Sequence, residues 1–226
     1  MATTATSVPL QSPLNATDDT TQTLQGFSLL DLEQFTLEGR YSPTSSNDFH
    51  QFYVGRDNVH DILKYVLSRV RVSLYLNMFG FDDDELNDIL MQKAKDPNVA
   101  MLITLDRSQA GGMHEKALLD ADQQISLSGL NTHFVSGISS THQFGQTKGF
   151  VADSVVGGQG SPNWSRSGEG TFSVVGSSGR PGSMGQTNIH TIFTSPDAIA
   201  RFQAELITEH MAAQNEPWKR PPNKKR

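Results

Sequence analysis

The pattern of hydrophobic positions predicts alternating strands and helices in the first half of the chain. Residues 50–54 have the composition of a strand, and residues 57–69 place aliphatic side chains on one helical face. Apolar and polar residues alternate over 71–81, which is typical of a strand, and the three aspartates 82–84 then precede a second helical pattern. The apolar run 99–105 predicts another strand. This order predicts an α/β fold, a mixed β-sheet flanked by helices.

The second half of the chain differs in composition: turns rich in Gly and Ser surround two short predicted strands, at 149–152 and 191–193. A helix is expected over 195–209, because Ser195 can cap it and Pro196 suits its first position. An apolar stripe on this helix predicts that it packs on the domain.

The two ends of the chain differ from this middle part in composition. Residues 1–25 are rich in Thr and Ser and contain no Lys or Arg, so we expect a disordered N-terminal segment. Residues 217–226 are expected to form a flexible basic tail, carrying Lys219, Arg220, Lys224, Lys225 and Arg226. Two interpretations of the tail stay open, a solubilising terminus and an electrostatic tether for nucleic acid.

Charge and composition narrow the function classes. The formal net charge of −6 argues against a polyanion-binding surface over the whole molecule. Because Cys is absent, thiolate metal sites and Cys nucleophiles are excluded, and a cytoplasmic location is favoured. Neither a secretory signal nor an apolar run long enough for a transmembrane segment is visible. Five histidines lack the sequence spacing that is typical of zinc sites, so no metal and no cofactor are expected: His50, His60, His133, His190 and His210.

The most informative stretch is Gln146–Gly170. Here Lys148 is followed after four residues by Asp153, and after six more by the tetrapeptide Gly160, Ser161, Pro162, Asn163. This spacing resembles the signature of the phospholipase D superfamily, in which His, any residue, Lys, four residues and Asp precede Gly-Ser-any-Asn. Gln146 stands at the position of the family's His. The resemblance covers residues 45–212 and implies a phospholipase D-like domain.

The residue types fit phosphate chemistry. Lys148 can bind a phosphoryl oxygen, and Ser161 and Asn163 can donate hydrogen bonds to charge that develops in the transition state. The resemblance implies that Asp153 contacts a pair of histidines. It also implies supporting roles for residues around the phosphate, namely Gly160, Ser165, Glu169 and Asn188.

Gln146 is the difficulty for catalysis. The family's mechanism uses one His as nucleophile and another as acid and base, and a carboxamide can do neither. His142, four residues upstream, is a possible surrogate. A single motif in the chain implies a homodimer in which two protomers share one active site.

Three function classes follow from this resemblance. The first is a metal-independent phosphodiesterase of nuclease type, acting on nucleic acid. The second is a catalytically impaired module that binds phosphate or nucleic acid. The third is a phospholipid-cleaving phospholipase D.

Overall fold

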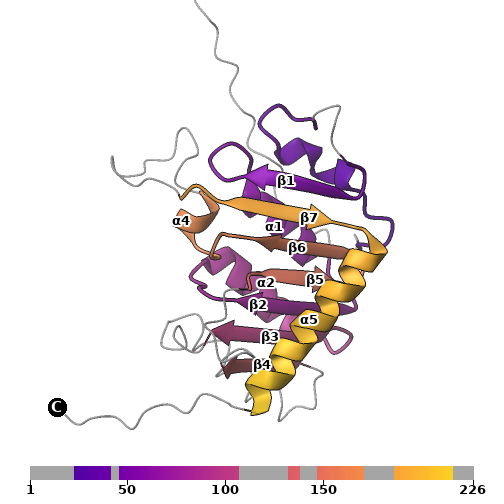
Figure 1. Ribbon diagram of the computed structural model, residues 1–226, viewed down its shortest axis with the longest axis vertical. Coiled ribbons are helices and arrows are strands. Elements are labelled where there is room, and N and C mark those ends of the chain that lie inside the picture. Colours follow the sequence, from indigo (N-terminus) through magenta and orange to yellow (C-terminus); the bar gives the residue numbers. More distant parts are fainter. Residues whose placement is uncertain (1–22, 42–45, 107–131, 138–146, 171–185, 216–226) are drawn as a thin grey trace, which may run out of the picture.

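One mixed β-sheet forms the centre of the molecule in the computed structural model (Figure 1). The model describes residues 23–41, 46–106, 132–137, 147–170 and 186–215. The sheet has seven strands in the order β1-β7-β6-β5-β2-β3-β4. Their bounds are β1 Phe49–Tyr53, β2 Ser73–Met78, β3 Ala100–Asp106, β4 Thr132–Gly137, β5 Gly149–Ala152, β6 Val156–Gly160 and β7 Ile189–Phe193.

The sheet is parallel at one side and antiparallel at the other. Strands β2, β3 and β4 are parallel neighbours, and a helix makes the crossover from β2 to β3. Strand β5 pairs antiparallel with β2 and starts the antiparallel series β5, β6, β7 and β1. The predicted α/β class with a mixed sheet is confirmed.

Helices cover both faces of this sheet. Helices α1 (Val59–Ser68) and α2 (Asp84–Ala94) contribute to the main core, which includes Leu74, Leu76 and Phe150 of the sheet. Helix α5 (Pro196–Asn215) crosses the opposite face, where it buries a second, smaller apolar cluster (Figure 1). No helix in the described part of the chain is both long and apolar enough to cross a membrane.

The packed unit begins well before residue 45, the expected start of the domain. Leu24, Leu29 and Leu32 are buried in the main core. A short 3-10 helix, η1 (Leu29–Phe35), carries two of them, and Ser28 caps it in a capping box with Asp31. The expected start was too late because a polar sequence surrounds these few leucines. Residues 1–22 and the basic tail lie outside the described residues.

Strand β6 has an unusual sequence for the middle of a sheet, Val-Gly-Gly-Gln-Gly. The glycines are required by close packing: a Cβ on Gly158 would lie 2.3 Å from the Phe150 ring, and one on Gly160 would lie 2.6 Å from Nδ1 of His190. Large rings on β5 and β7 therefore fill the space that β6 leaves free.

Candidate functional site

The motif residues lie on and around a β-hairpin, formed by β5 and β6. The pairing runs from Gly149 opposite Gln159 to Ala152 opposite Val156. Lys148 precedes β5 and Ser161 follows β6, so both lie at the open end of the hairpin, where the Gly160 N–H donates to the Lys148 carbonyl at 3.1 Å. Asp153 lies at the turn, the other end.

Asp153 holds the fold together at that turn. Its carboxylate accepts hydrogen bonds from the backbone N–H groups of Arg71, Val72 and Ser73, with distances between 2.8 and 3.1 Å. These hydrogen bonds direct its carboxylate to the start of β2, at the other end of the hairpin from Lys148, and the expected contact of Asp153 with a histidine pair stays a prediction. Asp153 is therefore a structural residue, which joins the hairpin to the neighbouring strand.

Lys148 lies near the end of β2. Its Nζ is 5.6 Å from the centre of the Phe79 ring, within the range of a cation–π contact. Partial burial lowers the pKa of Lys148. Because Lys148 and Phe150 are two residues apart along the same extended segment, their side chains emerge on the same face of the sheet.

Asn163 contacts the residue next to Phe79. A Cβ on Gly80 would lie 3.1 Å from Cγ of Asn163, so the amide packs directly against this glycine. Backbone bonds fix the arrangement, since the Trp164 N–H donates to the Gly80 carbonyl at 3.1 Å and the Asp82 N–H donates to the Trp164 carbonyl at 2.8 Å. The structure thus brings Lys148 and Asn163 to adjacent residues at the end of β2.

The amide oxygen of Asn163 is a distinctive feature of this place. Oδ1 is buried and has no hydrogen-bond partner among the described residues. Leaving a buried polar atom unpaired costs about 1–3 kcal/mol, which is uncommon unless the group has another use. Because Oδ1 is an acceptor, it cannot bind a phosphoryl oxygen; a hydrogen bond from Asn163 to a phosphate would come from Nδ2.

Ser161 is engaged in hydrogen bonds within the protein. Its Oγ donates to Oδ1 of Asn188 at 2.9 Å and accepts from the Ile189 N–H at 3.1 Å. Asn188 in turn donates through Nδ2 to the Gly168 carbonyl at 2.9 Å. The structure therefore places Asn188 next to Ser161, and both join the loop after β6 to the start of β7.

The comparisons with known proteins identify the fold. No protein-family model and no curated protein matches the chain. Among solved structures, it is similar to Nuc, a phospholipase D family member from Salmonella typhimurium, with a TM-score of 0.50 and 16% identity over 77% of this chain and 98% of that one. It is also similar to NucT from Helicobacter pylori, with a TM-score of 0.53 and 12% identity over 75% and 98% of the two chains. The chain has the phospholipase D fold.

A larger protein with this phospholipase D fold is also similar to the chain. The match to phosphatidylserine synthase from Haemophilus influenzae has a TM-score of 0.55 and 13% identity, and covers 85% of this chain but 43% of that one. The chain therefore spans nearly the whole length of Nuc and NucT and less than half of the synthase. Its size within the phospholipase D fold is that of the two shorter proteins.

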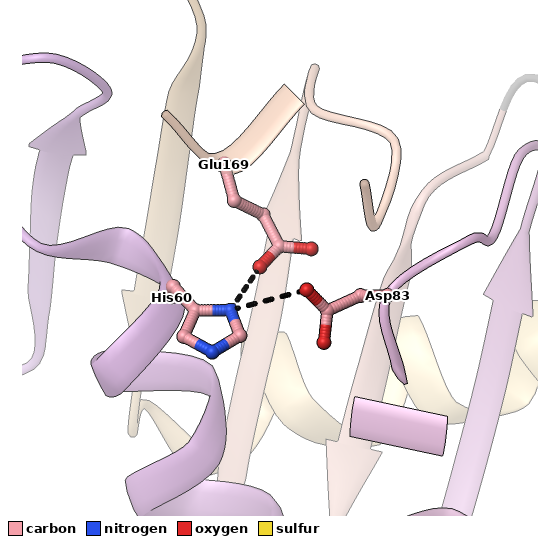
Figure 2. A group of neighbouring side chains, drawn as sticks. All are labelled: His60, Asp83 and Glu169. Carbon is pink, nitrogen blue, oxygen red and sulfur yellow. Dashed lines mark hydrogen bonds and ion pairs between the residues drawn. The ribbon is translucent and has the colours of Figure 1, made fainter. Parts of the chain in front are cut away.

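A short helix follows the motif, α4 (Arg166–Glu169), and Glu169 is its last residue. Ser165 precedes it, and the Gly168 N–H donates to Oγ of Ser165 at 3.0 Å, so Ser165 caps this helix. The side chain of Glu169 is buried, and its Oε2 lies 2.5 Å from Nδ1 of His60 (Figure 2). Burial raises the pKa of Glu169 to about 7.

His190 is a residue near the motif that its sequence position did not single out. It lies on β7 opposite Gly160, and its ring stacks on Phe150 with centroids 6.2 Å apart. Neither ring nitrogen has a hydrogen-bond partner among the described residues, and burial lowers the pKa of His190 to about 4. The only available signal was the Gly-x-Gly pattern of β6, which leaves room for a large ring on the neighbouring strand.

Gln146 and His142 lie outside the described residues. Their roles stay predictions from the sequence. In the described part of the chain, the open end of the hairpin presents one lysine and one asparagine amide, together with a serine that is already hydrogen-bonded. This set can bind an anion, but none of these three side chains is an imidazole.

Proposed function

We propose that the chain is a phosphodiesterase of phospholipase D type that acts on nucleic-acid phosphodiesters through a site shared by two protomers. The observation that supports this proposal is that Lys148 lies near the ring of Phe79 and Asn163 packs against Gly80, the two residues that follow β2. The fold shared with Nuc and NucT, over nearly the full length of both, supports it.

In the proposal, the scissile phosphate binds at the open end of the β5–β6 hairpin. Lys148 supplies a positive charge beside an aromatic ring, and Asn163 supplies an amide whose N–H group can donate to a phosphoryl oxygen. Ser161 keeps the loop in place through Asn188 and Ile189. Gly160, which carries no side chain, allows the His190 ring to pack directly against β6.

The chemical step requires an imidazole that Gln146 does not offer. A carboxamide is a poor nucleophile and does not titrate near neutral pH. In the proposal His142 takes this role: its nitrogen attacks phosphorus, the bond to the leaving oxygen breaks, and water then cleaves the phosphorus–nitrogen bond. The second protomer of a homodimer supplies the second imidazole, which protonates the leaving oxygen.

A second candidate is a module that binds phosphodiesters without cleaving them. It is favoured by Gln146, since loss of a catalytic nucleophile commonly lowers the rate by several orders of magnitude and leaves ground-state binding in place. The same residues, Lys148 and Asn163, would carry the binding.

Cleavage and binding are measured on the same material to separate these candidates. Fluorescent single-stranded and duplex DNA and bis(p-nitrophenyl) phosphate are incubated with the full chain, with and without EDTA. We expect slow cleavage that is lost in Lys148→Ala and in His142→Ala but kept in Lys95→Ala, a control at an exposed lysine. Cleavage that persists in Lys148→Ala contradicts the proposed site.

The outcome for Gln146→His decides between the two candidates. Binding without cleavage in the wild type, followed by strong cleavage in Gln146→His, establishes the binding module. Release of headgroups from phospholipid vesicles, with no effect on DNA, would assign the site to lipids instead. The absence of both binding and cleavage with every diester would overturn both candidates.

A further inference from the structure

A second group of polar side chains, one imidazole and two carboxylates, lies where the helices α1, α2 and α4 come together. His60 of α1, Asp83 at the N-terminus of α2 and Glu169 of α4 point toward one another (Figure 2). One donor atom from each lies within 4.8 Å of the other two. Because these residues are far apart in the sequence, the expectation of no metal, which rested on short histidine spacings, did not consider them.

The two carboxylates of this group are buried, and not all of their oxygens have a hydrogen-bond partner among the described residues. Asp83 and Glu169 are each 3% exposed. Oε2 of Glu169 is bonded to His60, but Oε1 is buried and has no hydrogen-bond partner among the described residues. Asp83 uses Oδ1 to accept from the Leu86 N–H at 2.8 Å, and its Oδ2 faces Nδ1 of His60 at 3.5 Å.

The charge balance around His60 is negative. Three carboxylates lie near its ring nitrogens: Glu169 at 2.5 Å and Asp83 at 3.5 Å from Nδ1, and Glu85 at 3.4 Å from Nε2. One imidazolium compensates this negative charge incompletely, so a divalent cation would stabilise the group.

The other ring nitrogen of His60 is oriented as in many metal-binding histidines. Nε2 lies 3.4 Å from the carboxylate of Glu85, and this carboxylate also binds Nζ of Lys64. A carboxylate on the distal nitrogen favours the tautomer with the proton on Nε2, so the lone pair of Nδ1, which faces Glu169 and Asp83, can act as a ligand.

We propose that His60, Asp83 and Glu169 form a binding site for a divalent transition-metal ion, of which Zn²⁺ is the representative. An imidazole nitrogen with carboxylate oxygens suits zinc, whereas calcium and magnesium take oxygen ligands. In a tetrahedral site with bonds of about 2.0–2.2 Å, two ligand atoms lie about 3.4 Å apart. The distance of 3.5 Å between Nδ1 of His60 and Oδ2 of Asp83 matches this value. Oε2 of Glu169 lies 2.5 Å from Nδ1 of His60, so it would have to move away from the ring by about 1 Å.

The position of this site gives it a mechanical role. Glu169 is the last residue of α4, the helix capped by Ser165 directly after the motif. A metal ion bound here fixes α4 to α1 and to the start of α2, and thereby fixes the loop that carries Asn163. The ligands of the ion, His60, Asp83 and Glu169, are separate from the proposed phosphate-binding residues, so the ion is assigned no part in the chemical step.

Binding of Zn²⁺ alone tests the site without any reference to activity. The full chain, free of tags and treated with EDTA and then dialysed, is titrated with ZnSO₄ by calorimetry and with Co²⁺ by visible absorption. We expect binding of one ion per chain at this site, and a Co²⁺ spectrum in the visible range. In Glu169→Gln and in Asp83→Asn the affinity should fall at least about tenfold.

Matched variants keep the test decisive. Asp83→Asn retains an oxygen that can cap α2, so this variant is expected to fold, which circular dichroism checks. Asp84→Asn removes a charge from the next residue, which is exposed, and should bind Zn²⁺ like the wild type. The proposal is overturned if no ion binds at a stoichiometry of one, or if Asp83→Asn and Glu169→Gln bind Zn²⁺ as tightly as Asp84→Asn.

Discussion

At the scale of single residues, Asp153 shows how a motif residue can serve the fold. Three backbone N–H groups donate to its carboxylate, and its φ of 51° lies in the left-handed region. We predict that Asp153→Ala lowers the free energy of unfolding by about 3 kcal/mol, because the N–H groups lose a charged acceptor and Ala disfavours this φ. Urea denaturation followed by circular dichroism measures the loss.

A second variant separates the two causes at Asp153. Asn tolerates the left-handed region and keeps one acceptor oxygen, so Asp153→Asn should lose less stability than Asp153→Ala. Since Asp153 lies at the turn, DNA affinity should stay unchanged in the folded fraction of both variants. A weaker DNA affinity with an unchanged free energy of unfolding would show that Asp153 takes part in binding.

Glu169 predicts a pH dependence of stability. Its folded-state pKa of about 7, raised by burial, exceeds the ordinary value of 4.5. The fold therefore favours the protonated carboxyl, and this contribution is complete below about pH 4.5 and is lost as the pH rises through about 7. The raised pKa of His60 acts in the same direction.

The comparison with Glu169→Gln isolates this contribution. In metal-free buffer, the free energy of unfolding of the wild type minus that of Glu169→Gln should fall by on the order of 3 kcal/mol between pH 4.5 and pH 8. The difference is needed because the lowered pKa of His190 has the opposite effect, a loss of stability as the pH falls from 6.5 toward 4. A difference that is constant with pH would show that Glu169 does not titrate in this range.

At the scale of elements, α5 closes the face of the sheet opposite to α1 and α2. Leu206 is buried beside Val151 and Ile199, whereas Met211 of the same helix is 53% exposed. We predict that Leu206→Ala costs about 2–4 kcal/mol of stability, because it leaves a cavity under the helix. Met211→Ala should change the stability by less than about 0.5 kcal/mol, and equal losses in thermal or urea unfolding would contradict this packing.

The elements also show what local sequence can predict. The helix at α1 and the strand at β5 follow from periodicity and apolar composition, and the structure has them within a few residues of the predicted bounds. Strand β6 was not predicted, because its three glycines disfavour a strand until the rings of neighbouring strands fill their space. Helix α5 continues to Asn215, six residues beyond the predicted end.

The candidate site was predictable only where its spacing is local. Lys148 and Asn163 lie within one motif, and in the structure they lie against neighbouring residues, Phe79 and Gly80. The supporting role of Glu169 near the phosphate stays a prediction, and its partners His60 and Asp83 come from other parts of the chain. No periodicity in one sequence indicates such a long-range contact.

At the scale of the whole molecule, the distribution of charge bears directly on the proposed substrate. The five cations of residues 217–226 offset an otherwise acidic chain, so residues 1–216 have a formal net charge of −11 within the total of −6. An acidic body repels a polyanion, and the proposed phosphate-binding groups, Lys148 and Asn163, act against this repulsion. We therefore expect the proposed nucleic-acid binding to depend on the tail.

We predict that replacing Lys219, Arg220, Lys224, Lys225 and Arg226 by Gln weakens DNA binding in full-length protein and flattens its salt dependence. Each phosphate that is neutralised on duplex DNA contributes about 0.9 to the slope of log K against log salt, so the magnitude of the slope should decrease by up to about 4.5 per chain. Fluorescence anisotropy from 50 to 200 mM salt measures it. Lys95→Gln with Arg201→Gln is the control on the exposed surface of the body. An unchanged slope would mean that the tail does not touch DNA, and a substrate without a long run of phosphates would then fit the acidic body better.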